Sequence, residues 1–168
     1  CFAINSIVAP CVIKFYRNDD ADTASRAEEE AKIWKTVYGD YGIDFAKVVK
    51  APRLFLLMPY LSTPCTLSER QNLVDEKSDQ NSMLYKALAH FTSKGYIHKE
   101  VRWHHVGLWK VKKTAPTRRG KSSGQSIEVG TEFAVFCDLE HAEPCLDAQV
   151  KAEWVKMTFS EMKQRIGE

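Results

Sequence analysis

The sequence predicts one α+β domain, in which a small antiparallel sheet with one helix precedes a short helical part that carries a hairpin. Two observations support this fold class. Strand-like apolar runs gather in the first 61 residues, around a single helical stretch. Helical spacing then dominates, and it is clearest where Met83, Leu84, Ala87, Leu88 and Phe91 recur along one face.

Length and composition limit the class of protein. A chain of 168 residues fits one domain and is long enough to bury a core. Its 44% hydrophobic and 27% charged residues are ordinary for a soluble globular protein, and a net charge of +2 gives no global signal for nucleic acid or membrane. No apolar stretch approaches the length of a bilayer span, so we expect no membrane partner. Five cysteines without a C-x-x-C pair indicate reduced thiols in an intracellular compartment.

The first 61 residues predict strands around one helix. Residues 1–8 and 11–16 are apolar enough for two strands separated by a turn at Ala9-Pro10, and the second strand contains Lys14. Residues 24–38 form the expected helix, with acidic residues early and lysines later, as the helix dipole favours. Residues 45–49 and 53–61 are apolar runs split by Ala51-Pro52, which predicts a hairpin.

The second part predicts helices around a polar loop. After a linker at 62–66, residues 67–76 and 82–94 are expected helices with a loop between them, and Gly95 ends the second helix. Residues 106–111 and 132–137 are expected strands, separated by a basic stretch at 110–121 and a Gly- and Ser-rich stretch at 122–130. A terminal helix is expected over 147–164.

The polar loop is the strongest functional signal. Residues 98–105 read His-Lys-Glu-Val-Arg-Trp-His-His between apolar anchors, and such a concentration of polar groups suggests a site held by a scaffold. The pattern resembles the catalytic loop of the protein-kinase-like superfamily. Its Arg102-Trp103 pair is most similar to the kinase-like domains of Crinkler-type effectors of oomycetes and fungi. The resemblance implies a kinase-like fold, with an N-lobe and hinge at 1–61 and a truncated helical C-lobe at 62–168.

The resemblance also implies a nucleotide site, with ATP and Mg²⁺ or Mn²⁺ as cofactors. Val12-Ile13-Lys14 is similar to the kinase strand whose lysine contacts the phosphates, and Glu30 is its expected partner, with Glu29 as the alternative. Met58 takes the gatekeeper position. Hinge residues 59–61 would meet adenine through the backbone of Tyr60 or Leu61, because Pro59 has no N–H.

The implied catalytic and metal residues depart from the family pattern. Glu100 takes the place of the catalytic Asp, and Arg102 that of the basic residue that contacts the transferred phosphoryl group. His105 stands where the family has a metal-binding Asn, whereas Asp138 keeps the metal-binding Asp at the end of a strand. A Gly-rich phosphate loop is not found in the sequence, and little remains of the substrate-binding lobe. These departures predict a degenerate kinase fold.

Three functions follow as hypotheses. The first is a pseudokinase-like module, an intracellular effector or signalling protein that acts through protein binding in the cytoplasm or nucleus, or in the host nucleus for a Crinkler-type effector. The second is a reduced ATP- and metal-dependent phosphotransferase with Glu100 as base. The third is a nucleic-acid-associated effector that uses the basic loop at 110–121. An alternative metal site would use four loop residues: His98, Glu100, His104 and His105.

Overall fold

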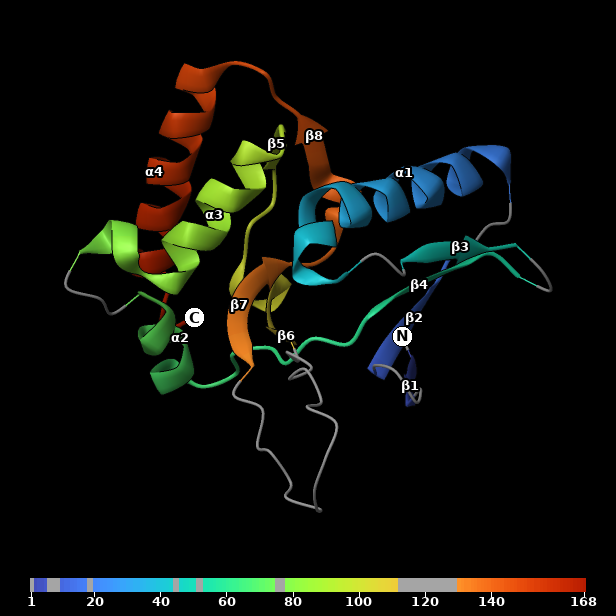
Figure 1. The fold of residues 1–168 in the computed structure, drawn as a ribbon, viewed down its shortest axis with the longest axis horizontal. Coiled ribbons are helices and arrows are strands. Elements are labelled where there is room, and N and C mark those ends of the chain that lie inside the picture. The colour runs from blue at the N-terminus through green and yellow to red at the C-terminus, as the bar shows by residue number, and fades with distance from the viewer. Residues whose placement is uncertain are drawn as a thin grey trace, which may run out of the picture.

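The chain folds as an α+β structure with small antiparallel sheets and several helices (Figure 1). This computed structural model describes residues 2–5, 10–17, 20–43, 46–50, 53–74, 78–111 and 130–168. The strands are β1 (Phe2–Asn5), β2 (Pro10–Phe15), β3 (Lys47–Val49), β4 (Phe55–Pro59), β5 (Tyr96–His98), β6 (Val106–Val111), β7 (Thr131–Phe136) and β8 (Ala142–Pro144). The α-helices are α1 (Ala21–Tyr38), α2 (Leu67–Val74), α3 (Met83–Ser93) and α4 (Ala148–Gln164).

The first part is a four-stranded antiparallel sheet in the order β1-β2-β4-β3, with α1 beside it. The expected hairpin is confirmed as β3 paired with β4. Strand β2 lies between β1 and β4, so Lys14 stands inside the sheet and not at its edge. The side chain of Asp20 accepts a hydrogen bond from the Thr23 N–H and starts α1, three residues before the expected beginning.

One detail of this sheet differs from the expectation. Pro10 was expected in a turn, but it is the first residue of β2 and pairs in register with Asn5. Proline is tolerated at the first position of a strand, where its missing N–H removes little from the ladder. Phe45 and the turn residues Ala51-Pro52 lie outside the described residues.

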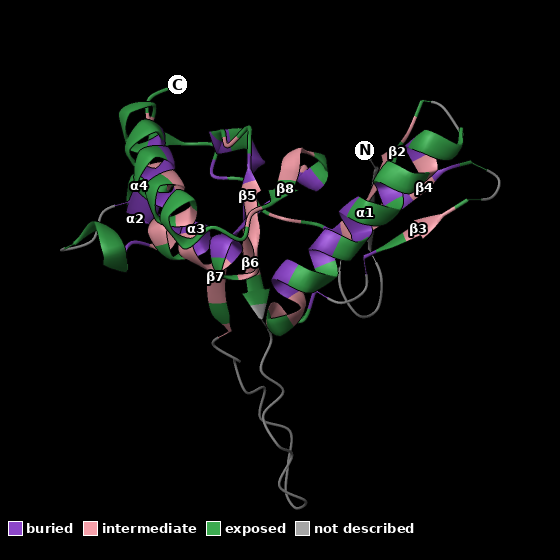
Figure 2. Cartoon of the chain, turned by 90° about the horizontal axis from the view of Figure 1, so that it is seen from above, coloured by how far each residue is buried: buried purple, intermediate pink, exposed green. Residues whose placement is uncertain are grey.

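Helices α2, α3 and α4 form the second part, on the opposite side of the molecule from the sheet (Figure 1). The expected helices are confirmed, with α3 capped by the Ser82 side chain and α4 by that of Asp147. Gly95 follows α3 with φ +90°, which suits glycine because it has no Cβ. Buried residues run along α1 and α3 and join one hydrophobic core through Trp34, Phe91 and Phe136, among others (Figure 2).

Two short antiparallel pairs lie between the sheet and the helices. The expected strands on either side of the basic stretch pair as β6 and β7. Most of that stretch, residues 112–121, lies outside the described residues, as do 122–129. The pair β5–β8 was not expected, and it runs from Tyr96 opposite Pro144 to His98 opposite Ala142. It fixes the polar loop after β5 next to the turn that follows β7.

Candidate functional site

Lys14 on β2 is the centre of a cluster of charged side chains. Its Nζ donates to Glu30 Oε2 on α1 at 3.0 Å and to Asp138 Oδ1 after β7 at 2.9 Å. A third carboxylate, Glu140 Oε2, lies 3.2 Å from the same ammonium. The pairing of Lys14 with Glu30, the residue preferred over Glu29, is therefore confirmed. The cluster also joins residues from both halves of the chain.

Glu30 is the most deeply buried member of the cluster, with 1% of its side chain exposed. Its Oε2 accepts from Lys14 and from the Tyr16 hydroxyl, each at 3.0 Å, whereas Oε1 is buried without a partner among the described residues. Burial raises the pKa of Glu30, and the charge and hydrogen bond of Lys14 oppose that rise. Burial lowers the pKa of Lys14, but the Glu30 and Asp138 carboxylates outweigh it and raise that pKa above its ordinary value.

Asp138 has a left-handed backbone, with φ 60° and ψ 49°, and it is the single non-glycine residue with positive φ among the described residues. This conformation starts a 3₁₀ turn at Leu139–His141, which brings Glu140 toward Lys14. Burial favours the neutral form of the Asp138 carboxyl, but its hydrogen bond with Lys14 reverses that effect and lowers its pKa. The Oδ2 atom lies 3.7 Å from Nε2 of both His105 and His141.

The polar loop is anchored by two histidines. His98 Nδ1 accepts the Glu100 N–H at 3.2 Å, so its Nε2 carries the proton and donates to the Asp138 carbonyl at 3.1 Å. Burial, together with the charge of His105, lowers the pKa of His98 to about 4, so the ring is neutral at pH 7. His105 is also buried, and its Nδ1 lies 2.5 Å from the Glu100 carbonyl.

The two residues predicted to be catalytic are not joined to the cluster. Glu100 and Arg102 are exposed, and neither side chain forms a hydrogen bond or ion pair with any described residue. The backbone of Glu100 is held by His98 and His105, and its carboxylate extends into solvent. The site therefore consists of the ion-paired cluster around Lys14 and, beside it, a loop whose backbone is held by hydrogen bonds and whose Glu100 and Arg102 side chains extend into solvent.

The residues predicted for nucleotide contact lie along β4 and the segment after it. Met58 lies opposite Val12 in the sheet. Val12 and Lys14 are two residues apart on β2 and share one face, so Met58 lies on the face of Lys14. Tyr60 is 48% exposed, whereas Leu61 is packed against β6 so closely that a Cβ on Gly107 would lie 2.5 Å from the Leu61 Cβ. The Leu108 N–H donates to the Ser62 carbonyl at 2.7 Å, which fastens this segment to the second half.

Three side chains could hold a cation. Ligand atoms of Asp138, Glu140 and His141 all lie within 4.8 Å of one another, and in the described part of the chain no other such group occurs. The alternative site at His98, Glu100, His104 and His105 is wrong, because both ring nitrogens of His98 already have protein partners. Reasoning from sequence missed His141, and the Asp-Leu-Glu-His run at 138–141 was the available signal. Carboxylate and imidazole donors together suit Mn²⁺ or Zn²⁺ better than Mg²⁺.

The comparisons with known proteins identify a family and no activity. Residues 2–109, more than half of the chain, match a family of unknown function, DUF5898, and the chain belongs to that family. The matched region includes Lys14, Glu30 and the polar loop but ends before Asp138. No curated protein matches the chain. Among the described residues, none of the helices has the length and apolar content needed to cross a membrane.

Proposed function

We propose that this member of the DUF5898 family is a degenerate, kinase-like module that acts by binding another protein. One observation carries the proposal: the Lys14 ammonium is held by three carboxylates, Glu30, Asp138 and Glu140, at 2.9–3.2 Å. The Lys14 ammonium donates two of its three N–H groups to Glu30 and Asp138, and Glu140 lies within ion-pair distance, so the phosphates of a nucleotide would have to displace these carboxylates. The cluster then serves as an internal clamp that holds the protein-binding surfaces in place.

The order of the elements supports the kinase-like part of the proposal. A strand with Lys14, a helix with Glu30, a hairpin, the loop at 98–105 and a strand ending at Asp138 follow one another as the resemblance implies. The Lys14–Glu30 ion pair fits the same interpretation. The free thiols of Cys65, Cys137 and Cys145 are consistent with an intracellular location, in the cytoplasm or nucleus.

The exposed loop side chains support binding over catalysis. A general base must lie within hydrogen-bond reach of the proton that it takes. The Glu100 carboxylate and the Arg102 guanidinium extend into solvent without a partner among the described residues. The nucleic-acid hypothesis has less support, because the basic loop lies mostly outside the described residues, and Lys110 is paired with Glu132 at 3.3 Å.

A metal-dependent phosphotransferase is the second candidate. It is favoured by the convergence of Asp138, Glu140 and His141 next to the Lys14–Glu30 pair. These three residues would hold a divalent cation, which would supply positive charge to neutralise phosphate oxygens. In this candidate, Lys14 exchanges its carboxylates for phosphate, Arg102 contacts the transferred group, and Glu100 accepts the proton of the acceptor hydroxyl.

Calorimetric titration with ATP separates the two candidates. The wild-type protein is titrated with ATP alone, with Mg²⁺ and with Mn²⁺, beside Asp138→Asn and the control Glu161→Gln, which neutralises an exposed carboxylate on α4. We expect no ATP binding under any of these conditions. Metal-dependent binding that Asp138→Asn abolishes and Glu161→Gln retains would overturn the first candidate in favour of the phosphotransferase.

A further inference from the structure

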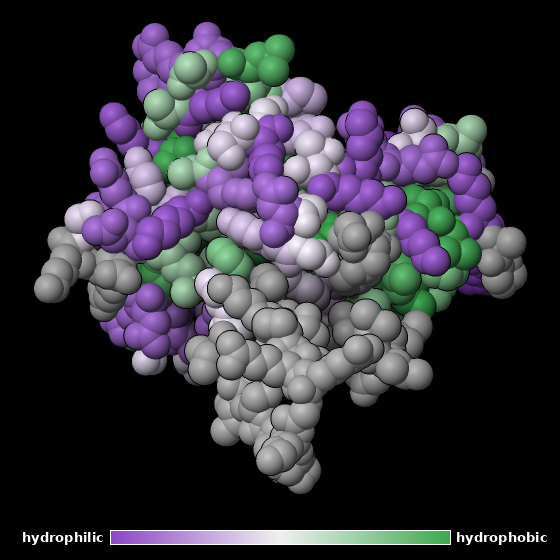
Figure 3. Space-filling model, in the orientation of Figure 1, coloured by the Kyte–Doolittle hydropathy of each residue, from purple (hydrophilic) through white to green (hydrophobic). Residues whose placement is uncertain are grey.

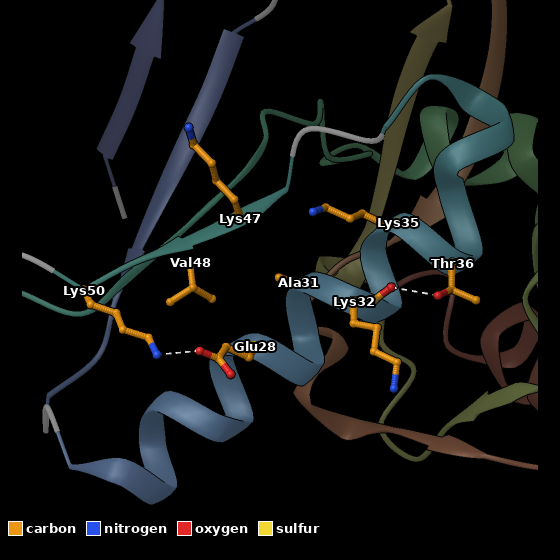
Figure 4. A pocket seen from close by; sticks show the side chains of 8 residues that line it. All are labelled: Glu28, Ala31, Lys32, Lys35, Thr36, Lys47, Val48 and Lys50. Atoms are coloured by element: carbon orange, nitrogen blue, oxygen red, sulfur yellow. Dashed lines mark hydrogen bonds and ion pairs between the residues drawn. The ribbon is translucent and has the colours of Figure 1, made fainter.

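A pocket of about 500 Å³ opens between α1 and β3 (Figure 4). Four of its eight lining residues are lysines: Lys32 and Lys35 from α1, Lys47 from β3 and Lys50 directly after it. Glu28 is the one acidic lining residue, so the lining has a net charge of +3. The whole chain has a net charge of +2, so positive charge is concentrated at this pocket.

Two of these lysines are paired and two are free for a ligand. Lys50 forms an ion pair with Glu28 at 2.6 Å, and Lys32 forms one with Glu29 at 3.3 Å. Lys35 and Lys47 have no acidic partner among the described residues, and both are exposed. Figure 4 shows Lys35 reaching from α1 toward β3 and the stem of Lys47 on the opposite side of the opening. Free positive charge therefore flanks the pocket on both sides.

The floor of the pocket is apolar and small. Ala31 is buried, and Val48 extends from β3 toward α1 between the lysines (Figure 4). The volume exceeds that of a single phosphate or carboxylate group and lies in the range of sites for small ligands or a few side chains. None of the eight lining residues is aromatic, so no base-stacking platform for single-stranded nucleic acid is present there. An apolar floor flanked by lysines fits a peptide with an apolar anchor and acidic neighbours.

We propose that the pocket between α1 and β3 binds an acidic segment of a protein partner. An apolar side chain of the segment packs on Ala31 and Val48, and anionic groups on either side of it pair with Lys35 and Lys47. The anions are carboxylates or phosphorylated hydroxyls, both of which a lysine ammonium group binds as a point charge. This inference rests on the proposed protein-binding function and names the chemistry of the partner.

Fluorescence anisotropy with defined probes tests the pocket. The probes are a labelled ten-residue peptide of Asp and Glu with one central Leu, the same peptide with two phosphoserines, its Asn and Gln analogue, and a labelled DNA duplex. We expect both acidic peptides to bind and the neutral analogue not to bind. The tighter of the two acidic peptides identifies the preferred anion. DNA binding that depends on Lys35 and Lys47 in the absence of peptide binding would overturn the proposal.

Charge reversal locates the binding. Lys35→Glu with Lys47→Glu should weaken acidic-peptide binding at least about tenfold, since two favourable charges become repulsive. The matched control, Lys86→Glu with Lys156→Glu, makes the same change in net charge at exposed lysines on α3 and α4 and should stay within about twofold of wild type. Circular dichroism verifies that both double variants fold. Equal weakening in both variants, or no binding to wild type, would contradict the pocket proposal.

The outcome is separable from the test of the general function. If the wild-type protein binds ATP and Asp138→Asn does not, the pseudokinase proposal is rejected, irrespective of the result with the peptides. If the protein binds neither ATP nor the acidic peptides, the pocket proposal is rejected and the general proposal stays in place. Peptide binding that depends on Lys35 and Lys47 together with a silent ATP titration would support both.

Discussion

Lys14 and Asp138 lie 124 positions apart in the chain and are joined by a hydrogen bond of 2.9 Å. The first residue belongs to the four-stranded sheet, and the second follows the β6–β7 hairpin. The same ammonium also holds Glu30 of α1. One side chain thus ties together a sheet, a helix and a hairpin, and its removal should affect the whole fold.

Removal of Lys14 tests this clamp. In Lys14→Met, the buried Glu30 carboxylate and its neighbours lose their counter-charge, and we expect the free energy of unfolding to fall by about 3 kcal/mol. Urea denaturation measures the change. Lys32→Met is the control, since it breaks an exposed ion pair with Glu29 on the same helix and should leave stability close to wild type. Equal stability of the two variants would show that the cluster is not a clamp.

Substitutions at Asp138 test its left-handed backbone. Asp138→Asn and Asp138→Ala both remove the charge that pairs with Lys14, but alanine tolerates positive φ less well than asparagine. We expect Asp138→Ala to be less stable than Asp138→Asn by about 1 kcal/mol in chemical unfolding. At Asp22, within α1, alanine should be at least as stable as asparagine, because alanine is the better helix former. If the Ala and Asn variants have the same order of stability at Asp138 as at Asp22, the strained backbone at Asp138 is contradicted.

The low pKa of His98 predicts a loss of stability in acid. The ring is neutral in the folded protein, with a pKa of about 4, and titrates near 6.5 when unfolded, so the unfolded chain binds more protons between these values. Stability should therefore fall as the pH drops from 6.5 to 4, by about 3 kcal/mol in total for this group. Glu30 has a raised pKa and contributes with the opposite sign near its own titration.

Comparison with His98→Gln isolates the histidine from the other groups. The difference in unfolding free energy between wild type and variant should shrink as the pH falls through this window, because only the wild type takes up the proton on unfolding. A difference that stays constant from pH 7 to pH 4 would contradict the buried neutral ring. Thermal or urea denaturation at several pH values supplies the measurement.

A substitution at Gly107 tests the contact of β6 with Leu61, which joins the two halves of the chain. A Cβ there would lie 2.5 Å from the Leu61 Cβ, so Gly107→Ala forces the β4–α2 connection or β6 to move and should lower stability by about 1–3 kcal/mol. Gly39→Ala is the matched control, because its φ of −55° suits alanine and no atom lies within 4 Å of the added carbon. If both variants unfold at the same denaturant concentration, the close contact does not exist in solution.

Much of the fold was predictable from local patterns. The spacing of apolar residues located α1, α3 and α4 to within a few residues, and Asp20, Ser82 and Asp147 cap them as such residues commonly do. The Lys14–Glu30 pair was expected from the resemblance to the protein-kinase-like superfamily, which implies a glutamate on the following helix as the partner of the strand lysine. Strand β8 was missed, because three residues ending in Pro144 carry no alternation from which a strand could be inferred.

The rest of the site depends on a backbone feature that residue patterns do not reveal. The left-handed Asp138 turns the chain so that Glu140 reaches Lys14 and His141 lies near Asp138. An ordinary extended continuation would have sent these side chains elsewhere. The exposure of Glu100 and Arg102 was equally hidden, because it follows from how His98 and His105 hold the loop backbone.

The contact of Leu61 and Ser62 with β6 has a mechanical consequence. The segment between the sheet and α2 is fastened at its first residues by a close contact at Gly107 and by the 2.7 Å hydrogen bond from Leu108 to Ser62. Together with the Lys14 cluster, this fastening joins the two halves at two separate places. A displacement of one half relative to the other would therefore have to break the Lys14–Asp138 hydrogen bond, the Leu108–Ser62 hydrogen bond, or both.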